Sequence, residues 1–190
     1  MALAKSQKYL VVGIVVVLAA AIVAGAWYLG KDTDAQEPGK NAKDLASKFA
    51  ENYDGSFGQF ELNSTSTSDH AVVVKENDSD RLKYSKINYT ATSEAQSQFD
   101  EIKSKIESME GFMGGTPTEI ENIAGFDGIC AYKMDIRMGA MTQFTLIYFV
   151  AYVDGVLVDA STDPLYHAGS LATETEITEL FAAVSASLSP

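Results

Sequence analysis

Apolar residues recur along the chain with two different periods, and the switches between them predict the order of helices and strands. Four apolar residues spaced by three or four positions predict a one-faced helix ending near Asp54-Gly55: Ala42, Leu45, Phe49 and Tyr53. Three β-branched or alternating segments follow, separated by turns rich in Ser, Thr, Asp and Asn. They predict strands at Phe57–Leu62, His70–Lys75 and Arg81–Thr90.

A second helical stripe follows these strands. Ser93 and Gln96 have the spacing of a capping box. The helix that they open carries one apolar face and breaks at Gly111, and the residues of that face are Phe99, Ile102, Ile106 and Met109. After a glycine-rich loop, a short strand is predicted around Ile120–Ile123.

The strongest strand signals lie in the last third of the chain. Ile129–Met138 alternates apolar and charged residues, whereas Met141–Val153 is apolar on both faces and is typical of a central strand. Asp154-Gly155 predicts a hairpin that returns through Val156–Ala160. Beyond Asp163-Pro164, a capping box formed by Thr173 and Glu176 predicts a last helix whose apolar residues face the sheet: Ile177, Leu180, Phe181, Val184 and Leu188.

The resulting order is helix, three strands, helix, three or four strands, helix. This order predicts an α+β domain with an antiparallel sheet packed by about three helices. The element order, and the run of glycine turn, strands, hairpin and terminal helix from Gly125 to Leu188, resembles the Mog1/PsbP-like α/β/α sandwich. The resemblance implies a non-catalytic accessory or assembly domain, and it transfers no site residue.

The segment before this domain is apolar and uncharged over a long run. Tyr9–Leu29 contains 21 residues without a charge, long enough to span a hydrocarbon core roughly 30 Å thick. Lys5 and Lys8 precede it, which places the N-terminus in the cytoplasm. The sequence therefore predicts a cytoplasmic N-terminus (1–8), a single-pass transmembrane anchor (9–29), a polar stalk (30–40) and an extracytoplasmic domain (41–190) at the cell membrane.

Two other interpretations of this segment remain open. Ala24-Gly25-Ala26 would satisfy a signal-peptide cleavage site before Trp27. A pilin-like leader cut after Ser6 would instead leave an apolar helix to pack in a filament core. Gly13, Ala21 and Gly25 could also let two such helices approach closely, which would give a homo-oligomer.

The charge of the domain restricts its partners. Residues 31–190 contain 12 Lys and Arg against 26 Asp and Glu, a net charge of −14. A surface this acidic repels phosphate backbones and anionic headgroups, so nucleic acid is excluded as a partner and the domain should stand off the lipid.

The sequence also carries features of an exported protein. Cys130 is the only cysteine, so no intramolecular disulfide can form. Asn63, Asn77 and Asn88 each begin an N-x-[ST] glycosylation acceptor. An acidic exported protein with such acceptor sequences and no disulfide fits an archaeal surface protein better than a bacterial one.

Three groups of residues have the residue types of a metal or catalytic site. Cys130, Met134 and Met138 share a strand face and could bind Cu(I) with His70 or His167, although core packing explains them better. The segment from Glu76 to Asp80 resembles the start of a calcium loop but lacks the glycine and glutamate that such loops need.

Asp163, His167 and Ser170 have the residue types of a hydrolase triad, but they are too close in sequence and lack a nucleophile elbow. The glycines between 111 and 115 match no phosphate-binding fingerprint and predict a loop that could form a binding lip. No cofactor and no metal are therefore expected.

These features favour a non-enzymatic, membrane-anchored surface domain that acts as a binding or accessory subunit of an envelope or membrane complex. The alternatives are a filament or surface-layer component, in which the apolar helix drives polymerisation, and an exported hydrolase.

Overall fold

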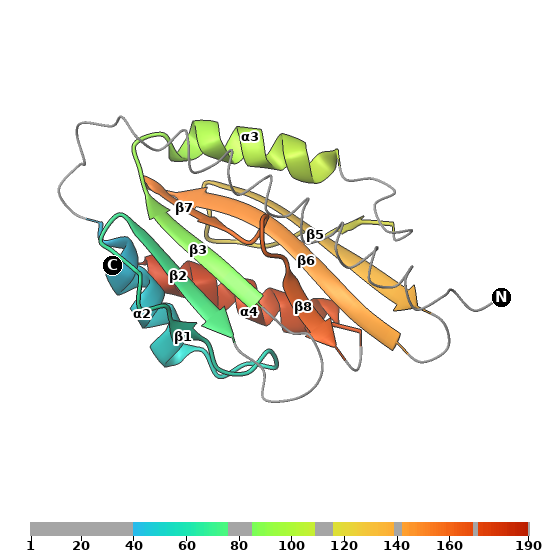
Figure 1. Ribbon diagram of the computed structural model, residues 1–190. Coiled ribbons are helices and arrows are strands. Elements are labelled where there is room, and N and C mark those ends of the chain that lie inside the picture. Colours follow the sequence, from blue (N-terminus) through green and yellow to red (C-terminus); the bar gives the residue numbers. More distant parts are fainter. Residues whose placement is uncertain (1–39, 76–84, 109–115, 139–141, 169–170, 190) are drawn as a thin grey trace, which may run out of the picture. The chain divides into compact units, whose positions relative to one another are not determined.

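An antiparallel sheet organises the chain in the computed structural model, which describes residues 40–75, 85–108, 116–138, 142–168 and 171–189 (Figure 1). The strands are β1 (Glu61–Leu62), β2 (His70–Lys75), β3 (Ser85–Ala91), β4 (Thr118–Glu119), β5 (Gly128–Met138), β6 (Thr142–Val153), β7 (Val156–Asp159) and β8 (Leu165–Ala168). The helices are α2 (Ala42–Asn52), α3 (Ala95–Glu107) and α4 (Glu174–Leu188). The predicted α+β class, with an antiparallel sheet and three helices, is confirmed.

The strand order is β1-β2-β3-β7-β6-β5-β4, with β8 also paired to β6, and every pairing is antiparallel. Hairpins within the first and the last parts of the chain build most of this order. The exception is the pairing of β3 with β7, in which Asn88 faces Asp159 and Ala91 faces Val156. Two halves of the chain that are distant in sequence therefore meet along β3 and β7.

Helices cover both faces of the sheet (Figure 1). We call the face on which α2 and α4 pack the inner face; Ile87, Tyr89 and Phe149 belong to its core. The outer face carries α3, whose Phe99 and Ile106 pack in a second cluster of buried residues. Alternation along each strand divides its side chains between these two cores.

β6 is the central strand, as its sequence predicts. It pairs with β5 along one edge and with β7 and β8 along the other. Ile147 and Phe149 point to the inner core, whereas Leu146 and Val150 point to the outer core. A strand buried on both faces must be apolar throughout, and this explains the continuous run.

Short sequence motifs determine the turn between β6 and β7 and the start of α4. The hairpin between β6 and β7 has Asp154 at φ 47° and Gly155 at φ 76°, the left-handed pair of a type I′ turn. At α4 the capping box is complete, because the Thr173 hydroxyl accepts from the Glu176 N–H (3.2 Å) and the Glu176 carboxylate accepts from the Thr173 N–H (2.7 Å).

Three local predictions are wrong. Ser93 and Gln96 form no capping box: α3 has Glu94 at its N-cap position, without a side-chain cap. The first strand is confined to Glu61–Leu62. The residues predicted to begin it serve the inner core instead, where Phe60 packs edge-on against Phe49 with ring centroids 5.3 Å apart.

The fourth strand lies at Thr118–Glu119 rather than at 120–123, because Asn122 turns the chain with a φ of 63°. β8 lies between Pro164 and the last helix, and the sequence does not predict it, because four residues give little periodicity.

Several predicted features fall outside the described residues: the anchor at 9–29 with its flanks, the calcium-like segment at 76–80, the glycine loop at 111–115 and Ser170. Within the described ranges, no helix is long and apolar enough to cross a membrane. The described residues all belong to one compact unit.

Candidate functional site

An interruption between β7 and β8 places polar side chains on the outer face. Both strands pair along the same edge of β6, β7 with Val150–Val153 and β8 with Phe144–Ile147. The chain leaves the ladder at residues 161–164, after a last hydrogen bond from the Ala160 N–H to the Phe149 carbonyl (2.9 Å). Extra residues of this kind redirect side chains out of a regular sheet.

Asp159 lies at the start of this interruption and is only 8% exposed. Its Oδ1 accepts hydrogen bonds from the Ser161 hydroxyl (3.0 Å), the Ser161 N–H (3.4 Å) and the Asn88 Nδ2 (3.3 Å). Burial raises the pKa of the Asp159 carboxyl above its usual range, and these hydrogen bonds together with the nearby His70 oppose part of the rise.

Neighbouring strands supply the rest of the cluster. Lys86 Nζ forms an ion pair with Asp163 Oδ2 at 2.8 Å, which ties β3 to the interruption. His70 Nδ1 lies 3.2 Å from the Thr90 hydroxyl, across the pairing of β2 and β3. We call these polar residues, on the outer side of β2, β3 and β7, the β3–β7 polar cluster: His70, Lys86, Asn88, Thr90, Asp159, Ser161 and Asp163.

The half of the outer face that holds this cluster differs from the other half. α3 packs on β5, β6 and β7, and no helix of the described ranges packs over β1, β2 and β3 on this side (Figure 1). The half-buried Val72 and Val74 point to the same side as His70, because Ala71 and Val73 belong to the inner core. This half therefore presents apolar and polar groups together.

The contacts of Asp159 give it a structural role. Its carboxylate already accepts from three donors, and the bond from Ser161 two residues on makes an Asx turn that holds the interruption. A carboxylate held in this way fixes the outward course of residues 161–164 and shapes the face around it.

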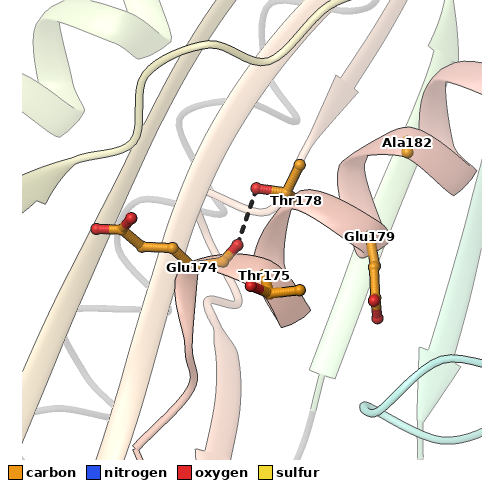
Figure 2. Close-up of a pocket in the computed structure, with 5 residues that line it drawn as sticks. All are labelled: Glu174, Thr175, Thr178, Glu179 and Ala182. Carbon is orange, nitrogen blue, oxygen red and sulfur yellow. Dashed lines mark hydrogen bonds between the residues drawn. The ribbon is translucent and has the colours of Figure 1, made fainter.

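A shallow depression on α4 is a second feature of the surface. Among the described residues its lining consists of Glu174, Thr175, Thr178, Glu179 and Ala182 (Figure 2). The Thr178 hydroxyl donates to the Glu174 carbonyl (2.8 Å), and the two carboxylates point in different directions (Figure 2). These side chains do not converge on a common point.

The structure separates the residues of the predicted triad. The carboxylate of Asp163 pairs with Lys86 on the outer side, whereas the ring of His167 packs edge-on against Phe57 of the inner core, with centroids 5.4 Å apart. Ser170 lies outside the described residues. Asp163 and His167 therefore do not assemble into a catalytic pair.

The sulfur residues lie where core packing places them. Cys130 and Met134 are buried in the outer core, and burial raises the pKa of the Cys130 thiol to about 11. His70 on β2 is four strands from β5, about 19 Å at ~4.8 Å per strand. Since His167 belongs to the opposite face, neither histidine can join Cys130 in a metal site; the side chain of Met138 is not described.

Two of the three acceptor asparagines lie within the described residues. Asn63 follows β1 in the connection to β2, and Asn88 lies in the middle of β3. Asn77 falls outside the described ranges.

The sequence does not reveal Asp159 as a site residue, nor its contact with the acceptor residue Asn88, because their proximity depends on the pairing of β3 with β7 and no local pattern reveals that pairing. One signal was available: Asp159 is a lone charge at the end of an apolar strand, Val156–Asp159.

Comparison with known proteins adds no assignment. No protein-family model, no curated protein and no solved structure matches this chain.

Proposed function

We propose that the protein is a non-enzymatic, single-pass membrane-anchored surface domain that binds a protein partner, as an accessory subunit of an envelope or membrane complex. The observation that carries the proposal is the uncharged run from Tyr9 to Leu29, with Lys5 and Lys8 before it and an acidic domain after it. This arrangement favours a signal-anchor with the C-terminal domain outside the cytoplasm.

The binding part of the proposal rests on the outer face over β1, β2 and β3. Val72 and Val74 lie there beside the β3–β7 polar cluster. Mixed apolar and polar surface of this kind is typical of protein interfaces that form and dissociate. The helices on both faces also agree with the Mog1/PsbP-like accessory domains that the element order resembles.

Site-specific photocrosslinking in native membranes tests this surface. A photoreactive phenylalanine is introduced in the full chain at His70 or Val72, and as matched controls at the exposed Gln96 of α3 and Thr175 of α4. We expect a discrete adduct of one mass from the first two positions and none from the controls.

Adducts from Gln96 or Thr175 alone would indicate that the binding surface lies on α3 or α4. Adducts from no position would contradict a partner-binding role. A ladder of self-adducts would favour the filament or surface-layer alternative.

A further inference from the structure

We propose that Asn63 carries an N-linked glycan and that Asn88, with the same type of acceptor sequence, does not. The inference rests on the extracytoplasmic location in the proposed function. It depends on how the fold presents the two carboxamide nitrogens, which are the atoms that a glycan would join.

Asn63 lies in a turn that exposes its acceptor sequence. The Asn63 carbonyl accepts from the Ser66 N–H (3.0 Å), and its side-chain Oδ1 accepts from the Thr65 N–H (2.9 Å) and the Thr65 hydroxyl (2.8 Å). Ser64 and Thr65 are exposed. All these bonds use oxygens of Asn63, and no described residue accepts a hydrogen bond from its Nδ2.

At Asn88, in contrast, the carboxamide nitrogen itself forms hydrogen bonds. The residue lies between Val72 of β2 and Asp159 of β7, and its Nδ2 donates to the Asp159 carbonyl and to Oδ1, both at 3.3 Å. Extended strand backbone separates Asn88 from Thr90 by about 6.6 Å, whereas the turn at Asn63 brings the Thr65 hydroxyl onto the asparagine side chain. The Thr90 hydroxyl contacts His70 instead. A glycan on Asn88 would replace one of the two hydrogens on the nitrogen that donates to the buried Asp159.

The transfer is a substitution at a sugar carbon. Asn63 Nδ2 attacks the anomeric carbon of a polyprenyl-phosphate-linked oligosaccharide, the new C–N bond forms, and the C–O bond to the phosphate breaks. The lipid phosphate leaves with the electron pair, and a base of the transferase takes one amide proton. The Thr65 hydroxyl, which already donates to Oδ1, is placed to polarise the carboxamide.

The position gives the glycan a physical role. β1 is an outermost strand of the sheet, and Asn63 continues its ladder through a hydrogen bond from its N–H to the Val72 carbonyl (2.8 Å). Open sheet edges invite pairing with other chains, and a bulky hydrophilic group at the end of β1 hinders it.

The test uses the full chain with Asn77→Gln, expressed in eukaryotic cells that transfer N-glycans and carrying a C-terminal epitope. The matched variants are Thr65→Val and Thr90→Val, each of which destroys one acceptor sequence and leaves its asparagine in place. Mass is compared before and after glycosidase treatment in the folded, protease-resistant fraction. Protease protection of the epitope in sealed microsomes reports the location of the domain independently.

We expect the Asn77→Gln chain to carry one glycan, Thr65→Val to lose it and Thr90→Val to keep it. A protected epitope with Asn63 unmodified, or a glycan on Asn88 in the folded fraction, would overturn the inference and leave the proposed location standing. An epitope digested in sealed microsomes would overturn both.

Discussion

At the scale of single residues, burial of the Asp159 carboxyl group disfavours its charged form. Water solvates an exposed carboxylate fully, whereas here one hydroxyl, one amide and one backbone N–H must replace it. The replacement is incomplete, because burial raises the pKa of Asp159. This residue should therefore make folding sensitive to pH.

We expect the free energy of unfolding to fall as pH rises from about 4 towards the pKa of Asp159, and Asp159→Asn to remove this fall. In that window the folded protein keeps its proton, while the unfolded chain, with a carboxyl pKa of about 3.9, loses it. Asparagine keeps the oxygen that accepts from Ser161. Denaturant unfolding between pH 4 and 8 measures the difference.

Glu176→Gln is the matched control, with the opposite sign. The N–H of Thr173 lowers the pKa of Glu176, so the stability that its charge contributes is present above about pH 4.3 and is lost as pH falls through the folded pKa. A pH profile that Asp159→Asn leaves unchanged would mean that Asp159 is solvated in solution.

Met134 tests the interpretation of the sulfur residues as core. The side chain is 1% exposed in the outer core, so Met134→Leu should cost less than about 1.5 kcal/mol, because the volume is nearly conserved. Met134→Asp should be severe, since it buries an unpaired charge. Arg137→Asp, at an exposed position of the same strand, should change stability by less than about 0.5 kcal/mol.

Thermal melts of these variants with added Cu(I) complete the measurement. A wild-type melting temperature that rises with copper, and that stops rising in Met134→Leu, would contradict packing as the only role of the sulfur.

At the scale of elements, the ends of helices show how far local sequence determines structure. Thr173 and Glu176 form the capping box that their spacing predicts, because apolar residues after them anchor α4 on the inner face. Ser93 and Gln96 have a similar spacing and form none. At the start of α3 the acceptor comes instead from the residue before Ser93: the Thr92 hydroxyl accepts a hydrogen bond from the Glu94 N–H at 3.2 Å.

Thr173→Ala should lower the free energy of unfolding by about 1 kcal/mol, because the first turn of α4 loses the oxygen that accepts from the Glu176 N–H. Thr178→Ala is the control: its hydroxyl bonds only within α4, so the change should stay within about 0.5 kcal/mol. Denaturant unfolding measures both. Equal effects of the two substitutions would mean that the cap contributes nothing specific.

The same contrast explains which parts of the molecule could be predicted from sequence. The β6–β7 hairpin, the central position of β6 and the cap of α4 each depend on residues within a few positions of one another, so a local pattern reveals them. The contact of Asn88 with Asp159 depends on which strands become neighbours. The total packing of the sheet decides that, and no short segment encodes it.

At the scale of the whole molecule, the chain combines an uncharged run with an acidic domain. We expect the intact protein to stay in membrane pellets after high-salt and carbonate washes, because 21 uncharged residues would have to leave the lipid to release it. Protease added outside cells should remove the residues after about Gly30. Fractionation, with sequencing of the mature N-terminus, measures this.

Two results would contradict the retained anchor. A released domain that begins at Trp27 would identify a cleaved signal peptide, and one that begins at Gln7 would identify a pilin-like leader.

The pairing of β3 with β7 also has a consequence for how the chain folds. The other strand pairings among the described residues join strands that are consecutive in sequence or, for β6 and β8, separated only by β7, so they can form early. β3 and β7 must instead close the long loop between Ala91 and Val156. The two halves of the sheet should therefore form as separate units and join late. Native-state amide hydrogen exchange should locate this boundary. We expect one half of the sheet to open at low free energy while the other stays closed. The backbone amide hydrogens that bond β3 to β7 should then exchange whenever either half opens.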